Sequence, residues 1–334
     1  SQLSKFNVAV GQQALENVTN SSLVNTYNIG IGAFAGRLIS TGTLNTVIGG
    51  FAGDALTTGY SNVALGYAAL TGEDTGRKNV AVGYRALYVQ NNDADNYNVA
   101  VGYDAGLSVT TGVQNTLIGG LAGDALTSGS DNVAVGYHAL SAEDGNGGNV
   151  AIGKFALLLQ NAGADAYNVV VGFEAGKTIS TGTTNTIMGA FAGDALTTGS
   201  NNVAIGYQAL STEDAHGRNV AIGKSTLQAQ DAGADAYNIA VGYNAGYSVT
   251  TGVQNVLIGG LTGDALTTGS SNVAIGYNSL SVEDAHGRNV AIGSNTLSNL
   301  DVGADAYNVA VGYNAGLAMS TGTNNTLIGG LAGD

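Results

Sequence analysis

The chain has 334 residues and a formal net charge of −14, from 24 acidic and 10 basic side chains, with no Cys and no Pro. This acidic balance argues against nucleic acid or an anionic membrane surface as a partner, because both are bound through clustered Lys and Arg. No apolar run approaches the roughly 18 residues that a membrane span needs, which predicts no membrane insertion, and the 53 Gly residues have no three-residue period, which excludes collagen.

One short motif, an Asn followed by an alternating apolar run and a Gly, recurs along the whole sequence. From Asn28 its steps are 17, 17, 17 and 19 residues, and this 70-residue pattern repeats in blocks that start at residues 28, 98, 168, 238 and 308. A fixed short period is typical of a solenoid of stacked coils. We therefore predict a single solenoid over residues 1–334. Because its last repeat is partial, we expect the sequence to be a segment of a longer chain.

Each repeat contains a segment with the pattern of a β-strand. Val99 and Val101 alternate with Ala100 and Gly102, and a period of two is the spacing at which strand residues share a face. A second apolar patch later in the repeat, such as Ala139–Leu140, predicts a shorter second strand. One repeat then forms one coil of a two-sided parallel β-roll, so the predicted fold class is all-β. A three-sided hexapeptide helix is disfavoured, because the aliphatic–Gly pair occurs once per repeat instead of three times.

The Asn that opens each repeat has a predicted structural role. If the coils stack in register, the side chains of Asn98, Asn115, Asn132 and Asn149 lie one above another. An amide carries both donors and an acceptor, so such a column can form a hydrogen-bonded ladder.

The strand also has a face of small residues, represented by Ala134 with Gly136 and by Ala204 with Gly206. Gly within a strand often marks a close approach of another backbone. We therefore expect this face to form a close-packed contact, with other chains as the partner.

The residues of this motif resemble those of a known class of surface protein. Asn-Val-Ala-Ile-Gly at 202–206, 219–223 and 289–293 resembles the head repeats of YadA-like trimeric autotransporter adhesins, and the longer form at 202–210 is similar to repeats of phage tail-fibre proteins. The resemblance implies a left-handed parallel β-roll of about 19 rungs, packed as a parallel homotrimeric fibre. It also implies an extracellular location, on a virion or a bacterial cell surface. The repeats are longer than those of typical adhesin heads, and we expect the added residues in outer turns.

An acidic turn is the strongest candidate for metal binding. Glu213, Asp214 and His216 lie within four residues of one another, and two carboxylates with an imidazole suit Zn²⁺ or Ca²⁺. The equivalent turns at 73–77 and 143–147 lack the His, so a surface charge pair is the favoured interpretation. Surface Ca²⁺ that is dispensable for folding is the accompanying expectation, and no cofactor is predicted.

No nucleophile elbow, Walker loop or dinucleotide fingerprint occurs with the right flanks, so we predict a protein that is not an enzyme. The leading function is the structural shaft of an adhesive or receptor-binding fibre, with a host-surface receptor or glycan bound by regions outside this segment. An ice-binding protein or a self-assembling extracellular filament is the alternative. Ice binding needs a regular Thr array, and the pattern of Thr110, Thr111 and Thr127 is interrupted by acidic turns.

Overall fold

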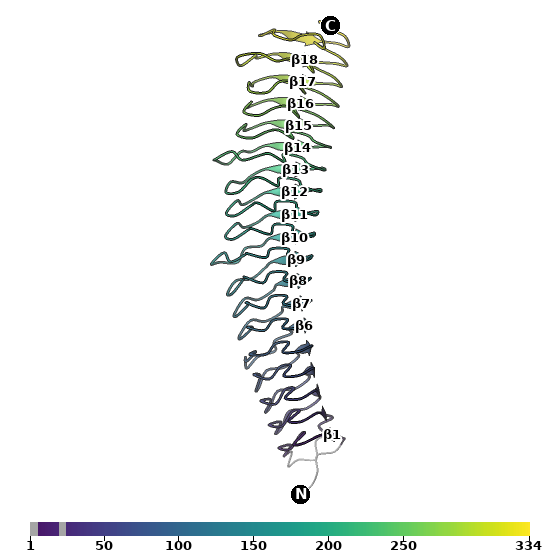
Figure 1. Cartoon of the computed structure of the whole chain (residues 1–334), viewed down its shortest axis with the longest axis vertical. Coiled ribbons are helices and arrows are strands. Elements are labelled where there is room, and N and C mark those ends of the chain that lie inside the picture. The colour runs from purple at the N-terminus through teal and green to yellow at the C-terminus, as the bar shows by residue number, and fades with distance from the viewer. Residues whose placement is uncertain (1–5, 20–24) are drawn as a thin grey trace. The chain divides into compact units, whose positions relative to one another are not determined.

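The computed structural model describes residues 6–19 and 25–334, and every helix or strand within them is a three-residue β-strand. The chain divides into two compact units, Ser1–Tyr167 and Asn168–Asp334. Each Asn motif of the sequence is followed at once by a strand, so one strand belongs to each repeat (Figure 1).

The strands have uniform length in both units. In the first unit they are β1 (Val8–Val10), β2 (Ile29–Ile31), β3 (Thr46–Ile48), β4 (Val63–Leu65), β5 (Val80–Val82), β6 (Val99–Val101), β7 (Thr116–Ile118), β8 (Val133–Val135) and β9 (Val150–Ile152). In the second unit they are β10 (Val169–Val171), β11 (Thr186–Met188), β12 (Val203–Ile205), β13 (Val220–Ile222), β14 (Ile239–Val241), β15 (Val256–Ile258), β16 (Val273–Ile275), β17 (Val290–Ile292), β18 (Val309–Val311) and β19 (Thr326–Ile328).

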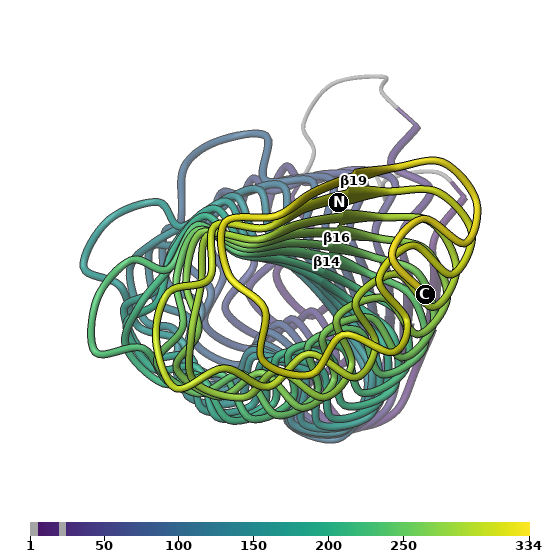
Figure 2. The same cartoon turned by 90° about the horizontal axis from the view of Figure 1, so that it is seen from above.

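Within each unit, strands that are consecutive in sequence are neighbours in one parallel sheet. Equivalent residues pair across it, as Ala134 of β8 does with Ala151 of β9 and Ala204 of β12 does with Ala221 of β13. Seen from above, the strands of successive coils lie over one another on one side, and the rest of each coil returns on the other (Figure 2). The predicted all-β parallel β-solenoid of about 19 coils is therefore confirmed.

The second strand predicted for each coil is wrong. After the strand, Gly136 has φ 137°, and His138 and Leu140 have φ values of 54° and 53°. This left-handed backbone interrupts an extended conformation. The second side of the β-roll consists instead of turns that hydrogen-bond from coil to coil, as the Leu140 N–H does to the Ala156 carbonyl at 3.0 Å.

The small face of the strand points into the coil. Ala134 and Ala204 have no exposed surface in the single chain, whereas the aliphatic residues on either side of them in β8 and β12 are partly exposed. The prediction that these alanines contact other chains is therefore wrong, because no partner can reach them. The close approach is between coils of one chain: a Cβ on Gly136 would lie 2.5 Å from the Gly153 carbonyl oxygen, and Gly206 is held in the same way against Gly223.

Two coil positions share the task of filling the interior. We number each coil from its Asn as position 1. Where position 9 is Gly, position 12 is aliphatic, as with Gly53 and Leu56, and a Cβ on Gly53 would lie 2.8 Å from Leu56 Cδ1. Where position 9 is Leu, as at Leu70, the space is already filled and position 12 is polar, as at Glu73. Leu56, Leu70 and Glu73 are all fully buried.

Replacing Ala204 by Gln should destabilise the folded chain itself. The added atoms would overpack a filled interior and bury an amide without partners, which together cost on the order of 2–5 kcal/mol in the free energy of unfolding. Urea denaturation measures this loss, and Ala234→Gln at an exposed loop position is the matched control. Equal stability of the two variants would contradict an inward-facing Ala204.

Candidate functional site

The Asn side chains form a buried column that links backbone groups of successive coils. Asn115 has no exposed surface. Its Oδ1 accepts the backbone N–H of Asn132 at 3.1 Å, and its Nδ2 donates to the Gly129 carbonyl at 2.8 Å. Its own backbone N–H donates to Asn98 Oδ1 at 2.9 Å. Each of these side chains therefore joins its coil to the next one.

The structure places Asn98, Asn115, Asn132 and Asn149 in this ladder, with the Asn149 N–H on Asn132 Oδ1 at 3.1 Å. The bonding differs from an amide-to-amide stack, because most rungs join a side chain to a backbone group. In a 19-residue coil a second amide takes part, and sequence analysis did not identify it. Gln230, at position 12, accepts from Asn238 Nδ2 at 2.6 Å and donates to the Thr250 carbonyl at 2.8 Å.

Replacing Asn115 by Ala should cost about 2–5 kcal/mol of folding stability, because it leaves two buried backbone groups, the Gly129 carbonyl and the Asn132 N–H, without partners. Chemical denaturation gives the number. Asn91→Ala, at an exposed Asn, is the control and should change the free energy of unfolding by less than about 0.5 kcal/mol. A ladder variant as stable as this control would contradict the assigned role.

The acidic turn identified in the sequence contains one buried carboxylate with an unused oxygen. Glu213 occupies position 12 of its coil and is fully buried. Its Oε1 accepts the His216 backbone N–H at 3.1 Å and lies 3.5 Å from His216 Nδ1. Neither Glu213 Oε2 nor His216 Nδ1 has a hydrogen-bond partner. The backbone N–H of Ala232 is close enough to lower the pKa of this carboxyl, but it does not complete a hydrogen bond of ordinary geometry to Oε2.

Stacking adds a residue that sequence analysis did not include. Asp231 holds position 13 of the next coil, the position that Asp214 holds in its own. Glu213, Asp214, His216 and Asp231 each present one ligand atom, and these atoms lie within 4.8 Å of one another. Seventy residues later Glu283, Asp284 and His286 form the same arrangement, again with Glu283 Oε2 and His286 Nδ1 unpartnered. The two predicted carboxylates and the His are therefore brought together.

The earlier blocks show how the buried Glu is satisfied when the turn differs. Glu73 Oε1 accepts the Gly76 N–H at 2.7 Å, and Glu73 Oε2 accepts from Asn96 Nδ2 at 3.0 Å. In the later blocks Ala replaces this Asn, at positions 166, 236 and 306. The corresponding Oε2 atoms, of Glu143, Glu213 and Glu283, have no partner.

Burial shifts the titration of all four glutamates in one direction. It raises the pKa of the Glu73 carboxyl from 4.5 to about 7, against the opposing effect of the backbone N–H groups of Gly76 and Asn92. Burial also raises the pKa of Glu143, Glu213 and Glu283. Loss of solvation disfavours the charged carboxylate, which is the physical cause.

Glu73 should therefore make the protein less stable as the pH rises. Its folded-state pKa lies above the unfolded value, so the folded state binds the proton more tightly, and stability is lost between about pH 4.5 and 7, by up to about 3 kcal/mol. Unfolding free energies at pH 5 and pH 8 measure the slope. Glu73→Gln should flatten it, since Gln does not titrate. An unchanged slope in the variant would show that Glu73 titrates normally.

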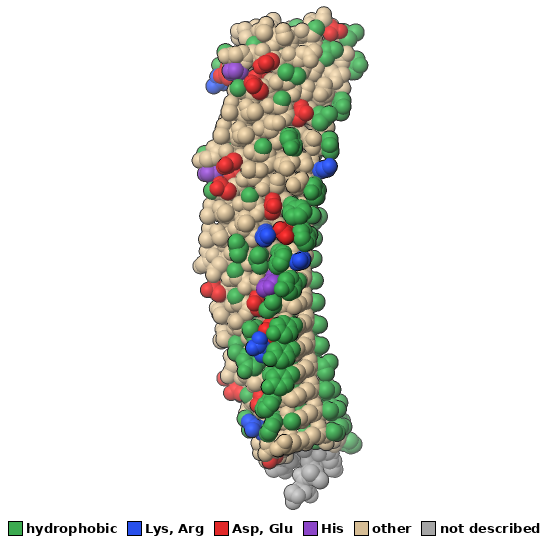
Figure 3. Space-filling view, viewed as in Figure 1, with side chains coloured by type: hydrophobic (Ala, Val, Ile, Leu, Met, Phe, Trp, Pro, Cys, Tyr) green, Lys and Arg blue, Asp and Glu red, His purple; other side chains and the backbone are tan. Residues whose placement is uncertain are grey.

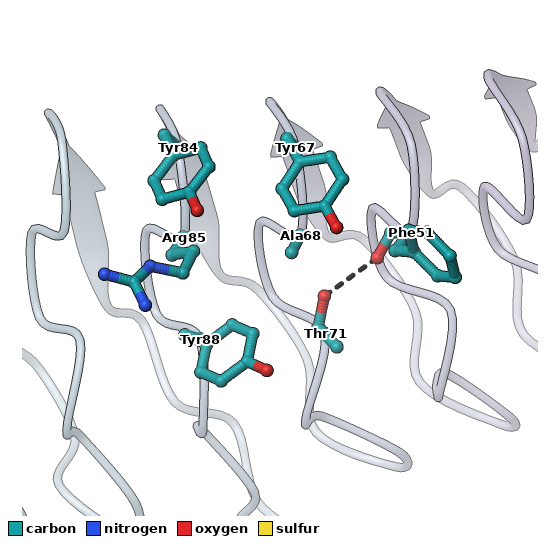
Figure 4. Close-up of a pocket in the computed structure, with 7 residues that line it drawn as sticks. All are labelled: Phe51, Tyr67, Ala68, Thr71, Tyr84, Arg85 and Tyr88. Atoms are coloured by element: carbon teal, nitrogen blue, oxygen red, sulfur yellow. Dashed lines mark hydrogen bonds between the residues drawn. The ribbon is translucent and has the colours of Figure 1, made fainter.

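A surface pocket of about 340 Å³ lies over three coils of the first unit. Figure 4 shows its lining: Phe51, Tyr67, Ala68, Thr71, Tyr84, Arg85 and Tyr88. The rings of Tyr67 and Tyr84 are stacked at 5.6 Å, and Arg85 is held by Asp104, with Nε 2.9 Å from Oδ1. Because the aromatic rings pack on one another and the cation is paired, we interpret this pocket as packing between coils.

The outward face of the sheet carries an apolar stripe in each unit, which sequence analysis did not assign to the surface. Positions 2 and 4 of the coils are Val, Ile, Leu, Thr or Met. The most exposed of their large hydrophobic side chains are Val8, Val10, Ile31, Leu65, Ile118 and Ile152 in the first unit and Val169, Met188, Ile239, Ile258 and Ile328 in the second. Figure 3 shows hydrophobic side chains lining the side on which the strands lie. We call these two positions the outward stripe.

No known protein family, curated protein or solved structure matches the chain. Among the described residues, no helix has the length and apolar character needed to cross a membrane.

Proposed function

We propose that this chain is the structural shaft of an extracellular fibre, with three copies packed in parallel and each copy wound as a left-handed β-roll. The observation that carries the proposal is the outward stripe, which repeats with every coil. Monomeric soluble proteins rarely expose contiguous apolar patches of more than a few hundred Å². Such a face is expected to be covered in the working assembly.

Area and period favour further copies of the same chain as the cover. Two outward side chains per coil, each partly exposed, present on the order of 1,000 Å² over nine or ten coils, which exceeds the roughly 800 Å² per partner of a stable interface. A partner must repeat with the same steps to stay in contact over that length, and the one protein certain to share the 17, 17, 17, 19 pattern is this one. Parallel packing keeps the 19-residue coils of all copies level.

The role of such a shaft is mechanical. Each coil is joined to the next by strand pairing, by the Asn ladder and by hydrogen-bonded turns, so length is gained by adding coils of one kind. The fibre is then an adhesin or a phage tail fibre that holds a recognition element, carried elsewhere in the fibre, at a distance from a virion or cell surface. This function requires no catalysis by these coils.

Ice binding is not favoured by the Thr geometry. Thr110 Oγ1 donates to the Thr127 carbonyl at 3.1 Å, and Thr127 Oγ1 donates to the Asp144 carbonyl at 2.7 Å. These hydroxyl protons are used between coils, and the column reaches an acidic turn after two coils. A self-assembling filament shares the outward stripe and differs from the shaft only in being open-ended.

Lys substitutions on the outward stripe should dissociate the assembly. Ile118→Lys with Ile152→Lys places two charges per chain in the proposed interface, while Leu159→Lys changes an equally exposed aliphatic residue outside the strands. Sedimentation analysis should give three times 33.2 kDa, or 99.6 kDa, for the wild type and the control, and 33.2 kDa for the double variant. A wild-type monomer would overturn the proposal, and mass that grows without limit with concentration would favour the filament.

A further inference from the structure

The two turns at Glu213 and Glu283 differ from every other acidic turn of the described chain by containing a His. In the described residues the other two turns of this type have Gly76 and Asn146 at the same coil position. With His, two atoms of opposite character, a carboxylate oxygen and an imidazole nitrogen, remain unpartnered next to one another. A fully buried carboxylate rarely leaves an oxygen unpaired without a reason.

We propose that Glu213, Asp214, His216 and Asp231 bind a first-row divalent cation, Zn²⁺ fitting best, and that Glu283, Asp284 and His286 form a second, weaker site of the same kind. The proposal is independent of the fibre function, since a single chain carries both sites.

The ligand chemistry favours zinc over calcium. Calcium takes six to eight oxygen ligands, whereas this cluster offers four ligand atoms of which one is an imidazole nitrogen. Zinc is bound tetrahedrally by His and carboxylates at about 2.0–2.2 Å, which places ligand atoms about 3.4 Å apart. The atoms now lie within 4.8 Å of one another, and the two exposed side chains, Asp214 and Asp231, have the freedom to close this difference by rotation.

Buried and exposed ligands would have different tasks. Glu213 is fixed by its burial and by the His216 N–H at 3.1 Å, so it provides a preset oxygen. Arg218, the nearby cation, is already paired with Asp235 of the next coil, so the cluster's charge is left for the metal. Because Asp231 comes from the coil after Glu213, the ion would join two successive coils by metal–ligand bonds.

The number of protein ligands ranks the two sites. Asp301 holds the position equivalent to Asp231, but the second cluster has only three ligands within 4.8 Å of one another. Water completes the coordination there, and the affinity should be lower. The site with Asp231 should therefore fill first as zinc is added.

Zinc binding to the untagged full chain, freed of metal with chelator and equilibrated with ZnCl₂ at pH 7.5, tests the proposal by elemental analysis. The wild type should bind two Zn²⁺ per chain. His216→Asn should lose the tighter equivalent, and His286→Asn should lose the weaker one. Asn occupies the same place in the second block, so both variants should fold, and circular dichroism checks this. His138→Asn removes a His outside the clusters and should retain both ions.

A gain-of-function variant provides the complementary arm. Asn146→His with Asn161→Asp copies the ligands of the Glu213 site into the second block, beside Glu143, and should add a third Zn²⁺. Asp231→Asn, which restores the residue found at position 161, should weaken the tighter site. Wild-type protein that binds no zinc, or zinc retained in full by the His216→Asn, His286→Asn double variant, would overturn the proposal. Calcium bound equally by that double variant and the wild type, with no zinc bound, would do the same.

Discussion

In a stacked coil, the backbone groups next to each chain reversal need partners in the coil that follows. The side-chain amide of Asn supplies them, because its oxygen and its NH₂ group reach a backbone N–H and a carbonyl of the next coil at the same time. At Asn115 these are the Asn132 N–H and the Gly129 carbonyl. Ser, Asp or Thr could provide only part of this pattern when uncharged and buried. The constant spacing of Asn in the sequence therefore fixes the register of the strands.

Interior volume is the second constraint, and it explains where polar groups are tolerated. A coil of 17 residues encloses little space, so a Leu at position 9 replaces the aliphatic residue at position 12. At Leu70 and Glu73 this exchange admits a carboxylate into a fully buried position, where the backbone of the turn provides hydrogen bonds. The buried glutamates are thus a consequence of how the core is filled, and the chemistry of each turn depends on what lies opposite Oε2.

Much of the fold was predictable from the sequence, and the failures have physical reasons. The period predicted the parallel solenoid, and Asn115 was correctly expected in a buried column. Alternation of Ala134 with its neighbours could not show which face is inside, because period two gives the same pattern for either orientation. The second strand failed because residues such as His138 and Leu140 adopt positive φ, for which neither residue type is a signal. Asp231 was missed because it is adjacent to Asp214 only after stacking. Comparing equal coil positions in successive repeats would have identified it.

Amide hydrogen exchange tests the central claim, that the buried Asn column holds successive coils together. Backbone N–H groups of the Asn residues, such as those of Asn132 and Asn202, are bonded to the preceding Asn side chain and buried. Exchange resolved by residue should therefore find them among the slowest amides, with opening free energies close to that of global unfolding. Exchange as fast as at exposed loop residues such as Gly163 and Gly233 would contradict the account.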